Sequence, residues 1–403
     1  MQEQRSGDRS APSRRAVALI ALALLALASS GGIYLWRSAA IPVTAPPRPF
    51  SGPPALVSVT PVSDREAWVV VHDSAASRSV LLHTGDGGAS WRPSFSIEGF
   101  GTVQVVDGRR ALLLGFRGGY QGRPSMPQVF STDDAGEHWH ALTLPEVGKS
   151  FRSVPFYLDA DHGWLLATHS TVAGDQSPQE VALWRTLDGG RHWGSLVRID
   201  GSHPTSHGIS NADQLLSVSF QDGDTGWMAT QGVAASAVLY ATHDGGRGWQ
   251  AVPLPAGPPG PAREDWLYVG SPVLSRDGRG VLPVVDRDVN RTWLYQTQDG
   301  GASWTNPYYS PGTGVLNVVF VDGSVGWAND SGAAWVTSDS GRSWLAATGL
   351  PGALQFGEVA PVSASVAWVQ GVEVGSGGPA RWAMFRTGDA GLHWTRVSQP
   401  AIS

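Results

Sequence analysis

From residue 55 onward, short stretches of apolar, aromatic and β-branched residues alternate with clusters of Gly, Asp and Ser. Examples are LLH (81–83), LYA (239–241) and MFR (384–386), each followed directly by a turn sequence. Stretches of this length between Gly- and Asp-rich segments are typical of β-strands joined by tight turns, and long runs of helix-forming residues are few. The pattern therefore predicts an all-β protein.

One octapeptide, Thr-x-Asp-x-Gly-x-x-Trp, follows these stretches throughout the chain. Its copies begin at Thr84 (TGDGGASW), Thr132 (TDDAGEHW), Thr186 (TLDGGRHW), Thr242 (THDGGRGW), Thr297 (TQDGGASW), Thr337 (TSDSGRSW) and Thr387 (TGDAGLHW). The intervals between successive copies are 48, 54, 56, 55, 40 and 50 residues. Such intervals suit one four-stranded blade of a β-propeller for each copy.

A looser pattern lies upstream of each octapeptide: an apolar stretch, a Gly- or Asp-rich turn, and a second apolar stretch. At one shared position the second stretch carries Trp68, Leu112, Trp164, Trp227, Val281, Trp327 and Trp368. Each repeat therefore reads as strand A, tight turn, strand B, variable loop, strand C, octapeptide turn and strand D. Because such units bury their faces only when packed in a ring, we predict a seven-bladed β-propeller over residues 55–403.

The pattern does not determine how the first and last blades meet. Residues 394–398 supply strand D of the seventh repeat. The first and last blades therefore meet without a shared strand, unless residues 41–55 pair across the seam.

The chemistry of the octapeptide suits a turn. Gly at the fifth position allows a positive φ, and Asp at the third position accepts hydrogen bonds from turn N–H groups. The opening Thr bonds locally, and the closing Trp covers the hairpin or fills the gap to the next blade. Seven carboxylates spread around a ring do not form one catalytic centre. We therefore assign a structural role to Asp86, Asp134, Asp188, Asp244, Asp299, Asp339 and Asp389, and to Trp91, Trp139, Trp193, Trp249, Trp304, Trp344 and Trp394.

These octapeptides resemble the Asp-box, or BNR, repeats of sialidases, sortilin-type propellers and xyloglucan-cleaving enzymes. The combination of F-x-D-x-x-x-G-W with T-x-D-G-G-x-x-W in each repeat is most similar to the photosystem II stability/assembly factor family, over roughly residues 51–403. The resemblance implies a propeller with one Asp-box per blade. It implies no particular reaction, because the fold hosts unrelated activities.

The N-terminal segment has a different pattern. Residues 1–15 are polar and basic, and residues 16–36 are uncharged and end in aromatic residues before Arg37. We expect a cytoplasmic N-terminus (1–15), a transmembrane signal anchor (16–37) that crosses the lipid bilayer through residues 16–36, and a Pro-rich linker (38–54). A cleaved signal peptide is the alternative, because ALA (26–28) resembles a cleavage site. The propeller is then either held outside a bacterial cell membrane or secreted.

Composition excludes several chemistries. The chain has no Cys, so it forms neither a disulfide framework nor a thiolate metal site or nucleophile. Residues 51–403 carry 22 Lys and Arg against 32 Asp and Glu, a net charge near −10. A nucleic-acid binder would need the opposite sign, so we expect no nucleic-acid partner. Nothing in the sequence indicates a cofactor.

The variable loops supply the candidate binding residues. In an antiparallel blade the A–B and C–D turns lie at one end, and the B–C and D–A connections lie at the other, here called the loop-rich end. Its loops include 115–128, 200–213, 255–265 and 284–292. Because loops on a rigid scaffold commonly carry function, we expect a site there, around the mouth of the central channel. The candidates are Arg117, Tyr120, Arg123, His203, His207, Trp266, Asp286, Asp288 and Arg291.

These candidates define no known reaction centre. His203 and His207 lack a paired carboxylate for a metal, and the Asp286–Asp288 loop lacks the Gly and distal Glu of an EF-hand. The early Arg-Ile-Pro signature of sialidases is missing, although another glycoside hydrolase needs only two facing carboxylates. We therefore expect a monomeric, assembly-factor-like module that binds a protein or glycan. The alternative is a sialidase- or xyloglucanase-like glycoside hydrolase with its active site at the loop-rich end.

Overall fold

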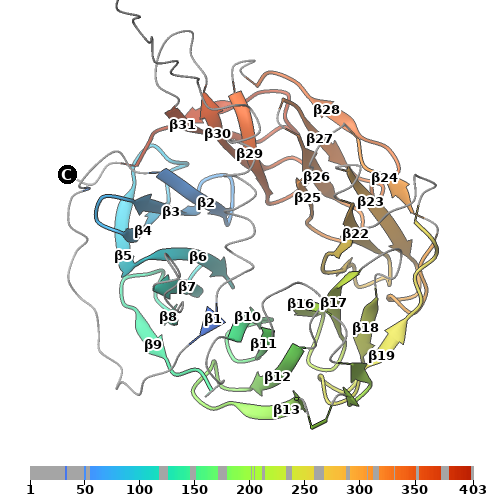
Figure 1. The fold of residues 1–403 in the computed structure, drawn as a ribbon. Helices are drawn as coiled ribbons and strands as arrows, with labels where there is room; N and C mark the ends of the chain where they lie inside the picture. The colour runs from blue at the N-terminus through green and yellow to red at the C-terminus, as the bar shows by residue number, and fades with distance from the viewer. Residues whose placement is uncertain are drawn as a thin grey trace, which may run out of the picture.

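The chain forms a ring of seven antiparallel blades, a β-propeller (Figure 1), which confirms the predicted fold class. The coordinates are a computed structural model. It describes residues 32–33, 50, 55–117, 126–145, 151–170, 179–200, 202–203, 205–210, 214–232, 238–257, 267–286, 291–305, 307–311, 317–330, 332–350, 354–373 and 381–400.

Four blades are simple four-stranded sheets in sequence order. Blade 1 contains β2 (Ala55–Pro61), β3 (Ala67–Asp73), β4 (Arg78–Thr84) and β5 (Arg92–Glu98). Blade 2 contains β6 (Phe100–Val105), β7 (Ala111–Arg117), β8 (Met126–Thr132) and β9 (His140–Leu142). Blade 6 contains β25 (Asn317–Phe320), β26 (Gly326–Asn329), β27 (Ala334–Thr337) and β28 (Leu345–Ala347). Blade 7 contains β29 (Leu354–Pro361), β30 (Ala367–Glu373), β31 (Arg381–Thr387) and β32 (Thr395–Val397).

The other three blades carry additions. Blade 3 contains β10 (Phe151–Tyr157), β11 (Gly163–Ser170), β12 (Gln179–Thr186) and β13 (Gly194–Ile199), and the hairpin of β14 (Thr205–Ser206) and β15 (Ile209–Ser210) follows it. Blade 4 contains β16 (Gln214–Phe220), β17 (Gly226–Gly232), β18 (Leu239–Thr242) and β19 (Gln250–Val252). Blade 5 contains β20 (Leu267–Val269), β21 (Val273–Leu274), β22 (Gly280–Asp286), β23 (Arg291–Thr297) and β24 (Tyr308–Tyr309).

Blades 4 and 5 are joined by main-chain pairing. β20 pairs with β22 of its own blade and also with the end of β17, where Gln231 and Gly232 face Tyr268 and Leu267. β18 pairs with β17 only as far as Ala229. The residues of β17 beyond that point pair with β20 instead. The two blades therefore form one nine-stranded sheet.

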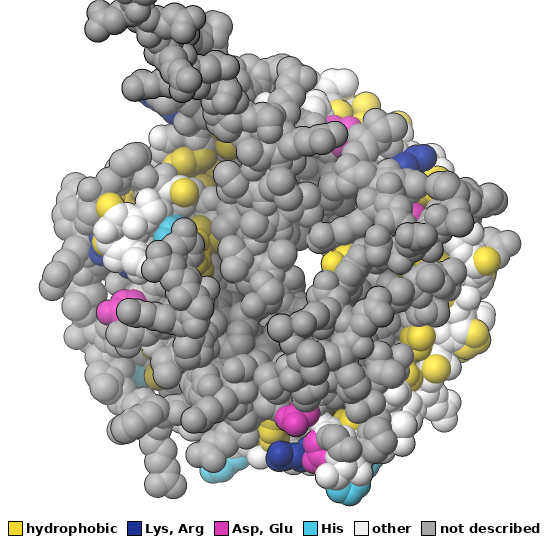
Figure 2. All heavy atoms as spheres, in the orientation of Figure 1, with side chains coloured by type: hydrophobic (Ala, Val, Ile, Leu, Met, Phe, Trp, Pro, Cys, Tyr) yellow, Lys and Arg dark blue, Asp and Glu magenta, His cyan; other side chains and the backbone are white. Residues whose placement is uncertain are grey.

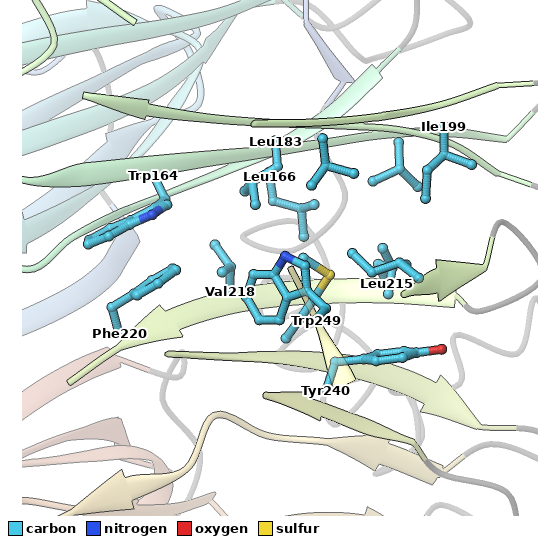
Figure 3. Close-up of a cluster of buried hydrophobic side chains, with 13 residues drawn as sticks. Trp164, Leu166, Leu183, Ile199, Leu215, Val218, Phe220, Tyr240 and Trp249 are labelled. Atoms are coloured by element: carbon cyan, nitrogen blue, oxygen red, sulfur yellow. The ribbon is translucent and has the colours of Figure 1, made fainter. Parts of the chain in front are cut away.

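Side chains from neighbouring blades form the core. All seven residues of β3 are buried, since Val69 and Val71 pack toward blade 7 while Trp68 and Val70 pack toward blade 2. Burial on both faces explains why the sequence AWVVVHD is a nearly continuous apolar stretch. Figure 3 shows the equivalent cluster between blades 3 and 4.

The shared position of strand B is buried in every repeat, as its apolar character predicts: Trp68, Leu112, Trp164, Trp227, Val281, Trp327 and Trp368. In Figure 3, the ring of Trp164 lies flat against Phe220, with centroids 3.6 Å apart. Fully burying an aromatic side chain stabilises the fold by about 1.5–3 kcal/mol. These residues therefore hold successive blades together.

The seam between blades 1 and 7 closes without a shared strand in the described part of the chain. Val59 and Leu82 of blade 1 pack against Trp368 and Val397 of blade 7, and Phe50 packs against the same cluster. Of the segment 41–55, residues 41–49 and 51–54 lie outside the described residues, and Ala55 begins β2 of blade 1. Side-chain packing therefore closes the ring together with hydrogen bonds across the seam, such as that from the Ser398 N–H to the Gly88 carbonyl oxygen (3.2 Å).

The N-terminal segment contributes one short strand. β1 (Gly32–Ile33) pairs antiparallel with β10, and it lies toward the middle of the ring in Figure 1. It falls within the predicted membrane segment 16–37, whose other residues lie outside the described ones. In the described portion, no helix has the length and apolar character needed to cross a bilayer. The membrane anchor stays a prediction.

Candidate functional site

The octapeptide of blade 1 illustrates how each turn is built. The Thr84 hydroxyl donates to Asp86 Oδ1 (2.8 Å) and accepts the N–H of Gly88 (2.9 Å). Asp86 Oδ1 also accepts the N–H of Ser90, and its Oδ2 accepts the Ser90 hydroxyl. The Thr–Asp, Gly–Thr and Asp–main-chain contacts recur in the other six copies. The fifth-position Gly has a positive φ in every copy, as the turn requires.

Each octapeptide is also tied to the A–B turn of its own blade. The N–H of its fourth residue donates to a main-chain carbonyl of that turn, as from Gly87 to Arg65 (2.7 Å) and from Ala390 to Ser365 (2.9 Å). The same bond occurs in the other five blades. The A–B and C–D turns therefore lie together, as predicted, at what we call the octapeptide end of the ring.

These hydrogen bonds engage the octapeptide carboxylates. The main-chain N–H and the ring of His192 lower the pKa of Asp188 to about 2, and the hydroxyl and N–H of Ser303 do the same for Asp299. A carboxylate held ionised in this way is a poor proton donor at neutral pH. The contacts agree with a structural role for these Asp residues.

The octapeptide Trp residues pack between blades. Trp139 of blade 2 meets Trp68 of blade 1 edge to face, with centroids 6.2 Å apart. Trp394 meets Trp327 of blade 6 in the same way, and Trp91 meets Trp368 across the seam. Both contacts expected for this Trp occur, because the indole N–H of Trp249, Trp344 and Trp394 also donates to the fifth-position Gly carbonyl of its own octapeptide.

Much of the loop-rich end lies outside the described residues. That part includes Tyr120, Arg123, Trp266 and Asp288, and only the main chain of Arg117, at the end of β7, is described. The Asp286 side chain is fully buried, so it is not available on the surface as predicted. Arg291, its cross-strand partner, lies with its guanidinium carbon 3.9 Å from the Tyr309 ring centroid. These two residues support the B–C hairpin of blade 5.

A comparable cross-strand pair supports the B–C hairpin of blade 1. Asp73 ends β3 and is buried, and Arg78 begins β4 with its Nε 3.6 Å from Asp73 Oδ2. Asp73 Oδ1 accepts the N–H of Ala76 within the loop. Glu373 and Arg381 occupy the corresponding positions in blade 7. An acidic residue and an arginine therefore face each other across the B–C hairpin in three blades, and in blade 7 the Glu373 carboxylate is paired with Arg396 of β32.

The structure does not bring His203 and His207 to the channel mouth. His207 accepts the N–H of Trp249, the last octapeptide residue of blade 4, through its carbonyl (2.8 Å). The β14–β15 hairpin lies against this octapeptide because Ile209 is buried in the core between blades 3 and 4. His203 is exposed and lies 3.3 Å from Asp200. Figure 2 shows acidic, basic and histidine side chains together at the edge of the ring near β13.

The described residues form a cavity of about 750 Å³ between blades 2 and 3, at the octapeptide end. Its lining comes from the A–B turn of each blade and from both octapeptides, including Arg109, Asp133, Asp161 and Arg191. The volume is within the usual range for small-molecule sites. Sequence reasoning missed this cavity because it placed function at the opposite end.

The cavity lies at a junction where the shared position of strand B is not a tryptophan. Five of the seven repeats have Trp at the shared position of strand B, but blade 2 has Leu112, which lines the cavity. Blade 5 has Val281 there, but Gln296 bonds both to Arg342 and to the Ser340 carbonyl of blade 6 and so fills that junction. The replacement of Trp by Leu was therefore the available sequence signal.

One carboxyl group near the central channel has an altered acidity. Burial raises the pKa of Glu358, on β29, while Asn317 acts in the opposite direction. The Gln370 amide donates to its Oε2 over 3.5 Å. A carboxyl group with a raised pKa is a candidate general acid. No group of three or more His, Asp or Glu side chains in the described ranges is placed to hold a metal ion.

Fold and site together define a seven-bladed β-propeller whose octapeptide turns are held by their own hydrogen bonds at one end and whose loops vary in length at the other. The chain is similar to YCF48 bound to D1 peptide, with 15% identity, coverage of 85% of this chain and 97% of that chain, and a TM-score of 0.50. It is similar to a PL25 ulvan lyase at 12% identity, with 89% and 98% covered and a TM-score of 0.51. A puromycin hydrolase gives 15% identity and a TM-score of 0.54, with 91% of this chain and 57% of that chain covered.

The similarity of these proteins is limited to the fold, because all identities are below 25%. They differ in what they bind or cleave, as expected for a fold that hosts many functions. No family model matches the chain, and no curated protein matches it in sequence.

Proposed function

We propose that this chain is an Asp-box (BNR) propeller that works as a binding or scaffold module for a protein or glycan outside a bacterial membrane. The observation that carries the proposal is the use of the octapeptide carboxylates. All seven accept hydrogen bonds within their own turns, so the most frequent acidic motif of the chain stabilises the ring. Variation in length falls at the loop-rich end, where a partner has room to bind.

Two further observations support this role. A YCF48 propeller, similar in fold, was solved with a bound D1 peptide. The uncharged residues 16–36 would hold the ring beside membrane partners, with the propeller on the outer face. The protein needs no cofactor for this function.

A glycoside hydrolase is the second candidate, and Glu358 is the residue that favours it. A hydrolase needs a second carboxylate facing the acid. The described side chains that act on Glu358 are instead two amides, those of Gln370 and Asn317. Binding is therefore the better supported function.

Site-specific photocrosslinking in the full-length chain tests the proposal. A photoreactive residue in place of Arg117, at the loop-rich end, should crosslink one discrete membrane protein in intact cells. The same residue in place of Glu137, an exposed octapeptide position, is the matched control and should not crosslink that protein. The purified chain should turn over no fluorogenic glycoside. Turnover that disappears in Glu358→Gln would establish the hydrolase instead.

A further inference from the structure

The cavity between blades 2 and 3 combines an apolar floor with a rim of mixed charge. Leu112 and Leu142 belong to the buried cluster beneath it. The rim carries exposed side chains of both signs: Arg109, Asp133, His140, Asp161 and Arg191. It therefore offers donors and acceptors side by side, above apolar side chains.

Part of this lining is already engaged by the protein. Arg110 lies 3.8 Å from Asp107, and Asp188 is held by its own octapeptide. Arg191 makes one hydrogen bond, to the carbonyl oxygen of Asp188 (3.2 Å). Within the described residues, the side chains of Arg109, Asp133 and Asp161 make no hydrogen bond. Their polar atoms remain available to a ligand.

Tyr157 adds a polar group below the rim. Its side chain lines the cavity and is 5% exposed, and its hydroxyl has no hydrogen-bond partner among the described residues. Burial, followed by the charge of Asp188, raises the pKa of Tyr157, so the group stays a neutral donor. Buried polar groups normally have partners, so this hydroxyl could bond a ligand that enters the cavity.

We propose that this cavity binds a neutral, hydroxyl-rich oligosaccharide. Each sugar hydroxyl both donates and accepts, so adjacent hydroxyls match a rim on which Arg109 and Arg191 stand among Asp133 and Asp161. The apolar C–H faces of the sugar rings suit the floor at Leu112 and Leu142. The site lies at the octapeptide end, so it does not depend on the partner proposed for the loop-rich end.

Charge argues against anionic ligands. A phosphate, a nucleic acid or an acidic peptide would meet Arg109 and Arg191 but would also face the acidic side chains of Asp133 and Asp161. Because the rim carries basic and acidic side chains together, a ligand with no net charge meets less repulsion than an anion. An acidic peptide is therefore the competing ligand in the test.

The test uses the full-length chain in a detergent without a sugar headgroup. An array of neutral oligosaccharides of two to four residues identifies the strongest binder, which is then titrated by calorimetry. We expect saturable binding that Arg191→Ala weakens about tenfold, because a charge-assisted hydrogen bond is lost. Leu112→Trp supplies the side chain that five other blades have, and it should weaken binding by covering the apolar floor of the cavity.

Arg247→Ala is the matched control. Arg247 occupies, in blade 4, the octapeptide position that Arg191 occupies in blade 3. It makes the same contact with a main-chain carbonyl but does not line the cavity. Its replacement should leave the affinity within about twofold. The proposal is overturned if no neutral oligosaccharide binds saturably, if a ten-residue acidic peptide binds more tightly, or if Arg191→Ala and Arg247→Ala have equal effects. Because Arg191 is exposed, that comparison stands even if Leu112→Trp fails to fold.

Discussion

The indole N–H of Trp368, in the last blade, donates to the carbonyl oxygen of Ser63 in the first blade, 3.1 Å away. The same bond joins Trp327 of blade 6 to Ser363 of blade 7, at 2.9 Å. Blades 6 and 7 are consecutive, whereas blades 7 and 1 meet across the seam. The seam therefore uses the contact found at an ordinary junction.

Removing the seam tryptophan should open the ring locally. Trp368→Ala leaves a cavity in the blade 1–7 cluster and should lower the free energy of unfolding by about 3–5 kcal/mol. We expect hydrogen exchange to become faster in β2 and β32 before global unfolding. Trp327→Ala is the control, with a similar total loss and no faster exchange at the seam. Equally faster exchange in β2 and β32 in both variants would contradict the assignment of this local opening to the loss of Trp368.

The octapeptide carboxylates should contribute to stability and not to ligand affinity. Asp244→Ala deprives the N–H groups of Arg247 and Gly248 and the Thr242 hydroxyl of their acceptor. We expect the free energy of unfolding to fall by about 1–2 kcal/mol in urea titrations. Glu137→Ala, at an exposed octapeptide position, should change it by less than about 0.5 kcal/mol. A loss of binding without a loss of stability would refute the structural role.

Acid should destabilise the ring over a defined interval. The pKa of Asp188, Asp299 and Asp389 is about 2 in the folded chain, below the value of about 3.9 in an unfolded chain. Their stabilisation is therefore complete above about pH 4 and is lost as the pH falls toward 2. Unfolding by urea between pH 2 and 5 measures this slope. Asp299→Asn should reduce the proton uptake on unfolding by up to about one proton, and an unchanged slope would contradict the assignment.

The buried pair at the B–C hairpin of blade 1 should be sensitive to the loss of one partner. Arg78→Met leaves the buried Asp73 carboxylate without this arginine and should cost about 3–5 kcal/mol. Replacing both, in Asp73→Val with Arg78→Met, should recover most of that loss. Arg279 and Asp277 lie at the same 3.6 Å but are exposed, so Arg279→Met should cost less than about 1 kcal/mol. Equal costs at the two pairs would show that burial does not matter here.

The fold was predictable because its signals are local. The octapeptide contacts join residues two and four positions apart, such as Thr84 with Asp86 and with Gly88, so each turn is complete within its own eight residues. Repetition of that turn then counts the blades. The burial of Trp164 and its equivalents follows from the same periodicity, because a ring leaves a neighbour on each face of every blade.

The site depends on contacts between distant residues, which a single sequence does not reveal. Leu112 was visible as an exception among tryptophans, but its effect depends on what blade 3 places opposite it. His207 was assigned to the wrong end because the burial of Ile209 decides where the hairpin lies. Asp286 reads as a surface acid in a polar loop, yet the fold encloses it. Tyr120, Arg123, Trp266 and Asp288 stay predictions.

The equivalence of the Trp327–Ser363 and Trp368–Ser63 contacts has an evolutionary consequence. Among the described residues, no strand is exchanged between the first and last blades, so the chain ends meet as two consecutive blades do. Circular permutants that begin at another junction should keep the same set of interblade contacts. For the same reason, duplication or loss of one whole repeat changes the circumference of the ring without requiring a new kind of closure. A gene assembled from such interchangeable units can vary one junction, as at Leu112, while the remaining junctions preserve the scaffold.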